Sequence, residues 1–158
     1  MEWHLEADSL SLTDLYFNGV VTVVDGNGAQ HQVLDFTAGG VDVVSMVTYA
    51  PNPNPLAGGK YIYNNGAKGK TVHLSNVHLH VLKQVGTISL GGLPILPVTL
   101  APGTPADAGS ALAMAIMYAA HALNAPVPPM TFTKVHVDQY TLTSNTLSVP
   151  GFNVNMQP

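Results

Sequence analysis

The sequence predicts a mainly β fold: a single-domain β-sandwich, roll or flattened barrel of about eight to ten short bent strands with one apolar helix. Three observations predict it. The alternation of apolar and other residues is repeatedly shifted by one position. Turns rich in glycine and asparagine separate segments of β-branched residues. One helical pattern covers residues 105–124. The 158 residues are enough to bury a core as one domain, 1–158, which carries the helix as an insertion.

The slipped alternation is clearest in Val72, Leu74, Val77 and Leu79, and the same spacing recurs within residues 130–137. Residues two apart on a strand share a face, so an odd step between apolar pairs requires a bulge or a corner. A wider form occurs three times, as Trp3, Leu5, Leu10, Leu12, as Leu34, Phe36, Val41, Val43, and as Tyr140, Leu142, Leu147, Val149. These units predict strands that bend around a common core.

Two hairpins are predicted in the first half of the chain. Valine-rich segments flank residues 25–28 (DGNG), whose glycines and asparagine favour the positive φ angles of primed hairpin turns. A second hairpin is expected around residues 64–66 (NNG), with residues 61–63 entering and residues 71–82 leaving. The alternating prolines of residues 51–55 predict an exposed loop, because proline lacks a backbone donor.

The second half contains the only convincing helix. Residues 87–102 are almost uncharged and are broken by glycine and proline, which predicts an edge strand or an extended arm that needs cover. The helix at residues 105–124 follows. Thr104 is expected to cap it, Pro105 suits its first position, and Asn124 ends it.

This helix is predicted to be apolar on nearly all sides, since Leu112, Met114, Ile116, Met117 and Leu123 are separated mostly by alanine. Such a helix is buried in the core, or against a neighbouring subunit or a lipid, and both interpretations stay open. Its uncharged run is shorter than the roughly 18 to 20 residues that cross a bilayer, so no transmembrane span is expected.

Composition limits the partners. Charged residues make up 9% of the chain, with five lysines, no arginine and a net charge of -4, so nucleic acid is not an expected partner. Low charge combined with 46% hydrophobic residues favours a homo-oligomer or larger assembly. The lack of cysteine excludes disulfides and thiolate chemistry. Strands rich in threonine, asparagine and glycine predict an extracellular or cell-envelope protein whose signal peptide has been removed or was never present.

Seven histidines provide the candidate chemistry. His78 and His80 lie two residues apart, as do His136 and Asp138, so each pair shares one strand face; residues 4–6 repeat this spacing. If the two strands are neighbours, these four residues form a zinc or copper site with nitrogen and oxygen ligands. The alternative is that they are the solvent-facing half of alternating strands. No other cofactor is expected.

Residues 97–100, 128–138 and 147–152, together with residues 10–17 and 33–36, resemble a group of secreted, β-rich actinobacterial proteins of unassigned function. The resemblance implies export to the cell envelope and provides no catalytic residues. The apolar helix departs from that group, in which a short proline-rich connection is expected. We interpret the helix as an added contact surface.

The leading hypothesis is a structural protein that self-associates through uncharged apolar surface. An enzyme is not expected, because the chain lacks the serine-hydrolase, zinc-protease and nucleotide-binding motifs. The alternatives are a protein that binds lipid or another hydrophobic ligand, and the metal-binding protein described above. The residues expected to make assembly or ligand contacts are Ile88, Leu90, Leu93, Ile95, Leu96, Leu112, Met114, Ile116, Met117 and Leu123.

Overall fold

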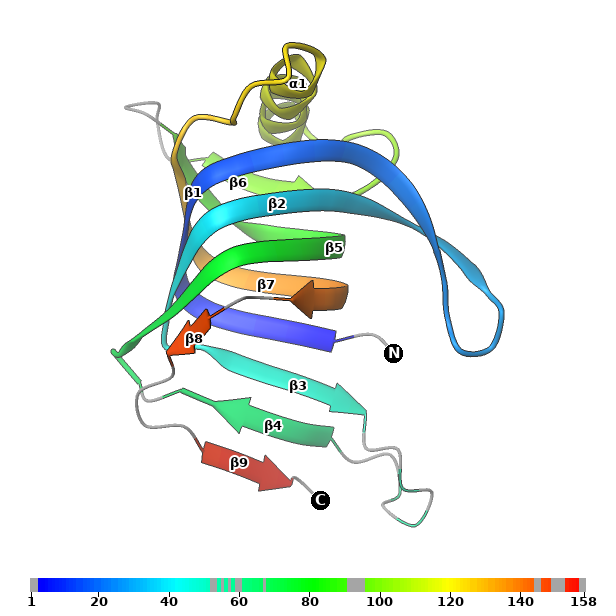
Figure 1. Ribbon diagram of the computed structural model, residues 1–158, viewed down its shortest axis with the longest axis vertical. Coiled ribbons are helices and arrows are strands. Elements are labelled where there is room, and N and C mark those ends of the chain that lie inside the picture. The colour runs from blue at the N-terminus through cyan, green and yellow to red at the C-terminus, as the bar shows by residue number, and fades with distance from the viewer. Residues whose placement is uncertain are drawn as a thin grey trace.

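The computed structural model confirms a mainly β fold (Figure 1). It describes residues 3–51, 54, 56, 58, 61–66, 68–90, 96–143, 146–148 and 153–156. The elements in chain order are β1 (Trp3–Val24), β2 (Gln30–Val44), β3 (Val47–Pro51), β4 (Tyr61–Asn65), β5 (Thr71–Leu90), β6 (Leu96–Leu100), α1 (Ala108–Ala122), β7 (Met130–Thr143), β8 (Thr146–Ser148) and β9 (Asn153–Met156).

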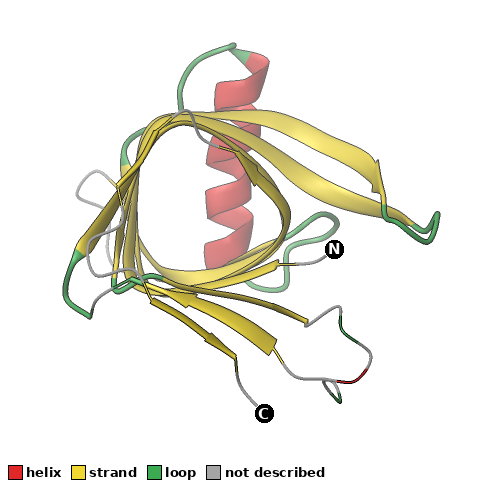
Figure 2. Ribbon diagram, turned by 60° about the horizontal axis from the view of Figure 1, so that its bottom comes forward, coloured by secondary structure: helices red, strands yellow, loops and turns green. Residues whose placement is uncertain are grey.

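Four long strands close a barrel. β1 pairs with β2 and with β7, β2 pairs with β5, and β5 pairs with β7, all antiparallel, so the circuit returns to its first strand. Figure 2 shows this circuit as a ring. β3, β4 and β9 continue the sheet from the N-terminal part of β1, while β6 and β8 pair with β5. With 22 residues in β1 and 20 in β5, long bent strands replace the short ones that were predicted.

The strands bend where the apolar alternation slips. Asp14, Asn76 and Lys134 have φ angles of 51°, 49° and 52°, in the left-handed region. Asn76, for example, lies between Leu74 and Val77, which are both buried. A residue in this conformation turns the strand. The side chains that face the core then come from odd-numbered positions on one side of the bend and from even-numbered positions on the other. The predicted change of face is therefore confirmed. Asp14 and Asn76 form corners, because the pairing register is the same on either side of them, whereas the register between β5 and β7 shifts by one residue beside Lys134.

The first predicted hairpin is confirmed, but its turn differs. Val24 pairs with Gln30 across the loop that joins β1 to β2. The carbonyl of Asp25 accepts a hydrogen bond from the N–H of Gly28 at 3.0 Å. Gly28, with φ of 81°, is the loop residue with positive φ. The reversal therefore uses a glycine bulge after the turn and not a two-residue primed turn.

The second predicted hairpin is wrong. In the described pairing, β4 lies between β3 and β9, whereas β5 starts with Thr71 opposite Val44 of β2. The N–H of Gly66 donates to the carbonyl of Met46 at 2.8 Å as the chain leaves β4. Residues 64–66 therefore mark the end of β4, and they do not form a hairpin turn that pairs β4 with β5.

α1 begins later than predicted. Asp107, and not Thr104, is its N-cap residue, because its Oδ1 accepts a hydrogen bond from the N–H of Ser110 at 2.7 Å. At the other end, Asn124 has φ of 50° and ends the helix as predicted. No helix in the described residues has both the length and the hydropathy that crossing a bilayer requires.

One face of α1 packs on the barrel, against β1 and β6 (Figure 1). This contact places part of the helix in the core, as the first interpretation of its apolar sequence predicted. Phe17 of β1 makes an edge-to-face contact with the ring of Tyr118, with centroids 5.0 Å apart. The buried residues of the helix are Ser110, Ala113, Met114, Met117 and Ala120.

α1 also covers β6, which is an edge strand within the range 87–102 predicted to form one; residues 87–90 of that range instead end β5 and pair with β7. Among the described strands, β6 pairs only with β5. The N–H of Thr99 donates to the Oγ of Ser110 at 2.8 Å, and Ser110 is fully buried. Gly109 permits this close approach, because a Cβ at that position would lie 2.9 Å from the carbonyl oxygen of Pro97. The helix therefore protects an edge that would otherwise expose unpaired backbone groups.

Candidate metal centres

Histidines and acidic residues gather on the outer face of the barrel, where they alternate with buried apolar residues. This is the solvent-facing arrangement that the alternative interpretation of the histidines predicted. Six of the seven histidines nevertheless lie within 3.3 Å of a carboxylate oxygen: His4, His31, His73, His78, His80 and His136. Within the described part of the chain, two groups of two histidines and one aspartate are close enough to share one metal ion.

The first group, which we call the His4 cluster, consists of His4, His136 and Asp138. The register places His4 of β1 opposite Asp138 of β7. The Nδ1 of His4 lies 2.6 Å from the Oδ1 of Asp138, and the Nε2 of His136 lies 2.8 Å from the same oxygen. One ligand atom from each of the three residues lies within 4.8 Å of the other two.

Glu6 and Tyr49 surround the His4 cluster. The Oε1 of Glu6 lies 3.1 Å from the Nδ1 of His136, which is the ring nitrogen not used toward Asp138. Tyr49 of β3 stacks on His4 with ring centroids 4.9 Å apart, and its hydroxyl donates to Glu6 at 3.3 Å. A carboxylate behind a histidine fixes the orientation and tautomer of the ring, which favours metal binding through the other nitrogen.

The second group, which we call the Asp35 cluster, consists of Asp35, His78 and His80. Asp35 of β2 lies opposite His80 of β5. The Nε2 of His78 lies 2.7 Å from one carboxylate oxygen of Asp35, and the Nε2 of His80 lies 3.3 Å from the other. The side-chain amide of Asn18 donates to Asp35 at 3.1 Å. Here too the three ligand atoms lie within 4.8 Å of one another.

Both carboxylates lose their proton more readily than usual. Partial burial raises the pKa of Asp138, but hydrogen bonds from His4 and His136 and the charges of the two rings outweigh it and hold the pKa below 3.8. Burial of Asp35 is outweighed in the same way, and hydrogen bonds from Asn18 and His78 lower its pKa. The ionised carboxylate is the form that binds metal, so Asp35 and Asp138 are both in the required state at neutral pH.

The four-residue site predicted from sequence does not form. β5 and β7 are neighbours, as the prediction required, but the register places His80 opposite Thr141 and His136 opposite Val85. At about 3.3 Å per residue, the offset from position 80 to position 85 separates the two histidine pairs by roughly 16 Å. Each predicted pair instead meets a third ligand from another strand.

These third ligands, His4 and Asp35, are what sequence reasoning missed. His4 meets a carboxylate 134 positions away, and Asp35 meets His80 after 45 positions. An acidic or histidine residue at an outward strand position is ordinary by itself. The repeated spacing at residues 4–6 was the one local signal for the first of them.

The predicted contact residues on the inner side of the molecule belong to its own core. Ile88, Met114 and Met117 are buried, while Leu96 and Ile116 pack partly buried against them. A small, partly open cavity beside Met117 measures about 10 Å³, which is close to the space that one water needs. The two methionines therefore pack against the barrel, and this cavity has no room for an acyl chain.

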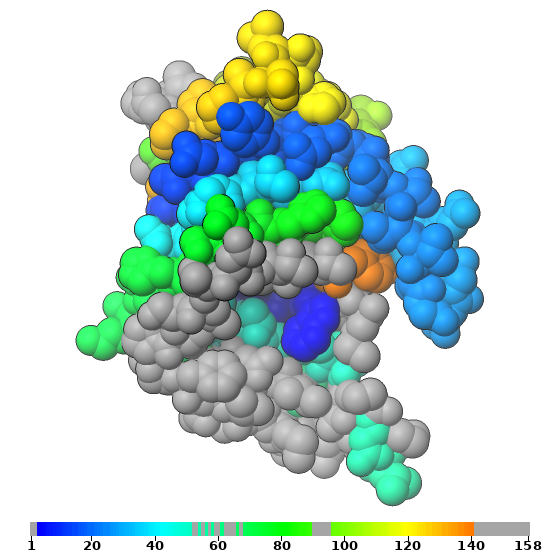
Figure 3. All heavy atoms as spheres, in the orientation of Figure 1, coloured from blue at the N-terminus to red at the C-terminus, as the bar shows by residue number. Residues whose placement is uncertain are grey.

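Of the other predicted contact residues, some are exposed and some lie outside the described residues. Leu112 on α1 and Leu123, the C-cap residue that follows it, are 47% and 77% exposed, and α1 forms the top of the molecule in Figure 3. Leu90 is the last residue of β5, and Leu93 and Ile95 lie outside the described residues. The exposed part of the predicted contact surface is thus the outer face of the helix.

Comparison with known proteins identifies no relative, since no family model, curated protein or solved structure matches the chain. The geometry of the two clusters is therefore the basis for inferring function.

Proposed function

We propose that this protein binds divalent transition-metal ions, zinc or copper foremost, through the His4 cluster and the Asp35 cluster. The observation that carries the proposal is the geometry of the His4 cluster. Two imidazole nitrogens and one carboxylate oxygen from neighbouring strands lie within 4.8 Å of one another, and a second carboxylate stands behind one imidazole.

The ligand set determines the metal class. Two imidazoles and one carboxylate suit zinc and copper, whereas calcium and magnesium prefer sites made of oxygen atoms alone. A tetrahedral zinc ion with ligands at about 2.0 to 2.1 Å holds those atoms roughly 3.3 Å apart. The nitrogen–oxygen distances of 2.6 and 2.8 Å at Asp138 therefore widen by roughly half an ångström when an ion enters.

The coordination is incomplete with protein ligands alone. Three ligands leave at least one position for water or a small ligand, as in exchangeable and catalytic sites and unlike closed structural sites. In the His4 cluster, His136 binds the ion through Nε2 while its Nδ1–H donates to Glu6, so the ring keeps one tautomer. Acid weakens binding, because protons compete for the imidazole nitrogens.

Metal content after equilibration with zinc at neutral pH, followed by desalting, tests this proposal. Wild type is expected to retain two ions per chain. His136→Ala and His80→Ala each retain one, and the double variant retains none. His73→Ala is the matched control, because His73 contacts Asp42 at 2.5 Å but belongs to neither three-residue group found among the described residues. A wild-type protein without zinc, or a double variant that keeps both ions, would falsify the proposal.

Self-association in the extracellular space or cell envelope stays a prediction, as do lipid binding and the resemblance to secreted actinobacterial proteins. The exposure of Leu112 and Leu123 on the outer face of α1 supports self-association. Light scattering over a concentration series, with wild type beside Leu112→Glu, tests it. An oligomer that is unchanged in the variant contradicts a contact through this face.

A further inference from the structure

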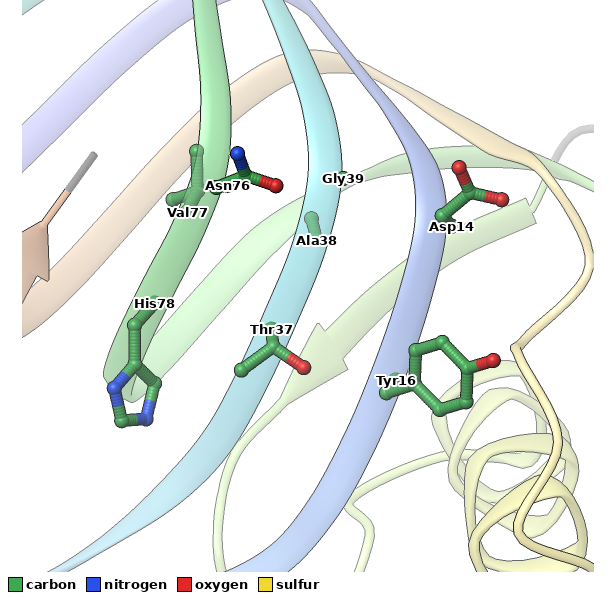
Figure 4. A pocket seen from close by; sticks show the side chains of 8 residues that line it. All are labelled: Asp14, Tyr16, Thr37, Ala38, Gly39, Asn76, Val77 and His78. Carbon is green, nitrogen blue, oxygen red and sulfur yellow. The ribbon is translucent and has the colours of Figure 1, made fainter. Parts of the chain in front are cut away.

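An open groove of about 360 Å³ crosses the outer face of β1, β2 and β5 where these strands bend. Its volume lies within the range of roughly 300 to 1,000 Å³ that small-molecule sites occupy. The lining residues, shown in Figure 4, are Asp14, Tyr16, Thr37, Ala38, Gly39, Asn76, Val77 and His78.

The groove is built from two rows of residues. Tyr16 pairs with Thr37 and Thr37 pairs with His78, so one row runs across three neighbouring strands. The other row lies at the bends, where Asp14 and Asn76 flank Gly39 on β2 (Figure 4). At about 4.8 Å between neighbouring strands, the outer members of each row stand roughly 9 to 10 Å apart.

Gly39 creates the hollow between these side chains. A Cβ at this position would lie 3.0 Å from both the Cβ and the Oδ2 of Asp14. Asp14 and Asn76 both have left-handed backbones. Lys134 bends β7 with a similar φ, so the bend alone does not make a site. Asp14 and Asn76 differ from Lys134 because both of them line the same groove.

The lining chemistry selects the ligand. None of the lining residues is a lysine or arginine, so the groove lacks the permanent cations that bind phosphate or carboxylate groups, and the imidazole of His78 already contacts Asp35. A carboxylate at Asp14 accepts hydrogen bonds from hydroxyls, and the amide of Asn76 both donates and accepts. The ring of Tyr16, in a side chain that is 37% exposed, offers an apolar surface with a polar tip.

From this combination we infer that the groove binds a neutral carbohydrate residue. A sugar ring presents adjacent hydroxyls and an apolar C–H face, which match the carboxylate and amide on one row and the aromatic ring on the other. An organic amine would also match Asp14 and Tyr16. The neutral hydrogen-bonding groups of Thr37 and Asn76 favour the sugar.

This inference goes beyond metal binding and is tested separately from it. His78 belongs both to the groove and to the Asp35 cluster. Binding is therefore measured with a chelator present, on an array of neutral oligosaccharides built from hexoses and N-acetylhexosamines. The best-binding oligosaccharide is then titrated by calorimetry against wild type and variants.

Wild type is expected to bind at least one of these oligosaccharides, and Tyr16→Ala and Gly39→Ala to weaken binding at least tenfold. Asp14→Asn keeps the size of the side chain and tolerates the positive φ, so a loss of at least threefold in this variant reports the lost charge and not a refolded bend. Tyr118→Ala, at a 46% exposed tyrosine on α1, is the matched control and stays within twofold of wild type.

Three results would overturn the inference. One is the absence of binding to every oligosaccharide at millimolar concentration. Another is equal binding by wild type and by all three groove variants when circular dichroism shows each of them folded. The last is binding of spermidine by the wild-type groove without binding of any sugar, which would assign the groove to amines.

Discussion

The Nδ1 of His4 lies 2.6 Å from the Oδ1 of Asp138, which joins the first strand of the barrel to β7 across 134 positions of sequence. The His4 cluster therefore exists only when β1 and β7 are paired. A metal ion held there binds the folded chain in preference to the unfolded chain and stabilises the closed barrel.

Zinc is accordingly expected to raise the stability of wild type. At a free concentration one hundred times the dissociation constant, each site adds about 2.7 kcal/mol to the free energy of unfolding. Urea unfolding with zinc and with chelator measures this gain. The double variant His80→Ala/His136→Ala should show no gain, and a gain equal to that of wild type would place the ion elsewhere.

An apolar residue of α1 and the apolar residue that caps its C-terminal end are expected to differ in their contribution to stability. Met117→Ala should cost about 2 to 5 kcal/mol, because Met117 is buried in the core and its truncation leaves a cavity. Leu123→Ala should change stability by less than about 0.5 kcal/mol, since Leu123 is exposed. Chemical denaturation of the isolated chain measures both, and similar costs would contradict the described packing of the helix.

Gly109→Ala is expected to destabilise the protein although alanine favours helices. Alanine in place of glycine normally stabilises a helix by about 1 kcal/mol. Here the added Cβ would lie 2.9 Å from the carbonyl oxygen of Pro97, so the helix must move away from β6. Thermal unfolding of Gly109→Ala beside Ala111→Gly, a helix position that is exposed, separates the clash from helix propensity. A more stable Gly109→Ala protein would mean that α1 does not approach β6 so closely.

Gln84→Leu is expected to stabilise the protein. Gln84 is 5% exposed, and its Nε2 has no hydrogen-bond partner among the residues that the structure describes. Burying such a donor costs roughly 1 to 3 kcal/mol, and leucine removes that cost while filling similar space. The free energy of unfolding should therefore rise by about 1 kcal/mol. A decrease in stability would show that the amide makes favourable interactions in the core.

The N-cap residue Asp107 gives a pH-dependent prediction. Hydrogen bonds from the backbone and side chain of Ser110 hold the pKa of Asp107 below 3.8. The folded state therefore favours the ionised form, so its contribution is present above pH 3.8 and is lost as the pH falls through the lower folded value. Asp107→Asn keeps an oxygen that caps the helix but does not titrate. The stability advantage of wild type over this variant should shrink in acid, and an advantage that is constant with pH would contradict the hydrogen-bonded cap.

Features determined by neighbouring residues were predictable from the sequence. The bends at Asn76 and Lys134 follow from a one-residue slip in apolar spacing. The hairpin between β1 and β2 and the edge strand β6 follow from their turn residues and low charge. The start of α1 was predicted too early, since Thr104 is also a suitable cap, whereas the helix begins at Asp107, which accepts the hydrogen bond from the N–H of Ser110.

Features that depend on the register between distant strands were not predictable. The two histidine pairs were recognised, but which acid or histidine completes each one depends on pairings such as His4 with Asp138 and Asp35 with His80. The wrong hairpin has the same cause. β4 and β5 are adjacent in sequence, yet each finds its partners elsewhere in the sheet because burial of the barrel core decides the pairing.

The most direct test of metal binding is a crystal structure of the protein soaked in zinc, with anomalous differences measured at the zinc absorption edge. We expect a peak bounded by the Nδ1 of His4, the Nε2 of His136 and a carboxylate oxygen of Asp138, with zinc–nitrogen distances of about 2.0 to 2.1 Å. A saturating soak that leaves no peak among these three atoms would contradict it.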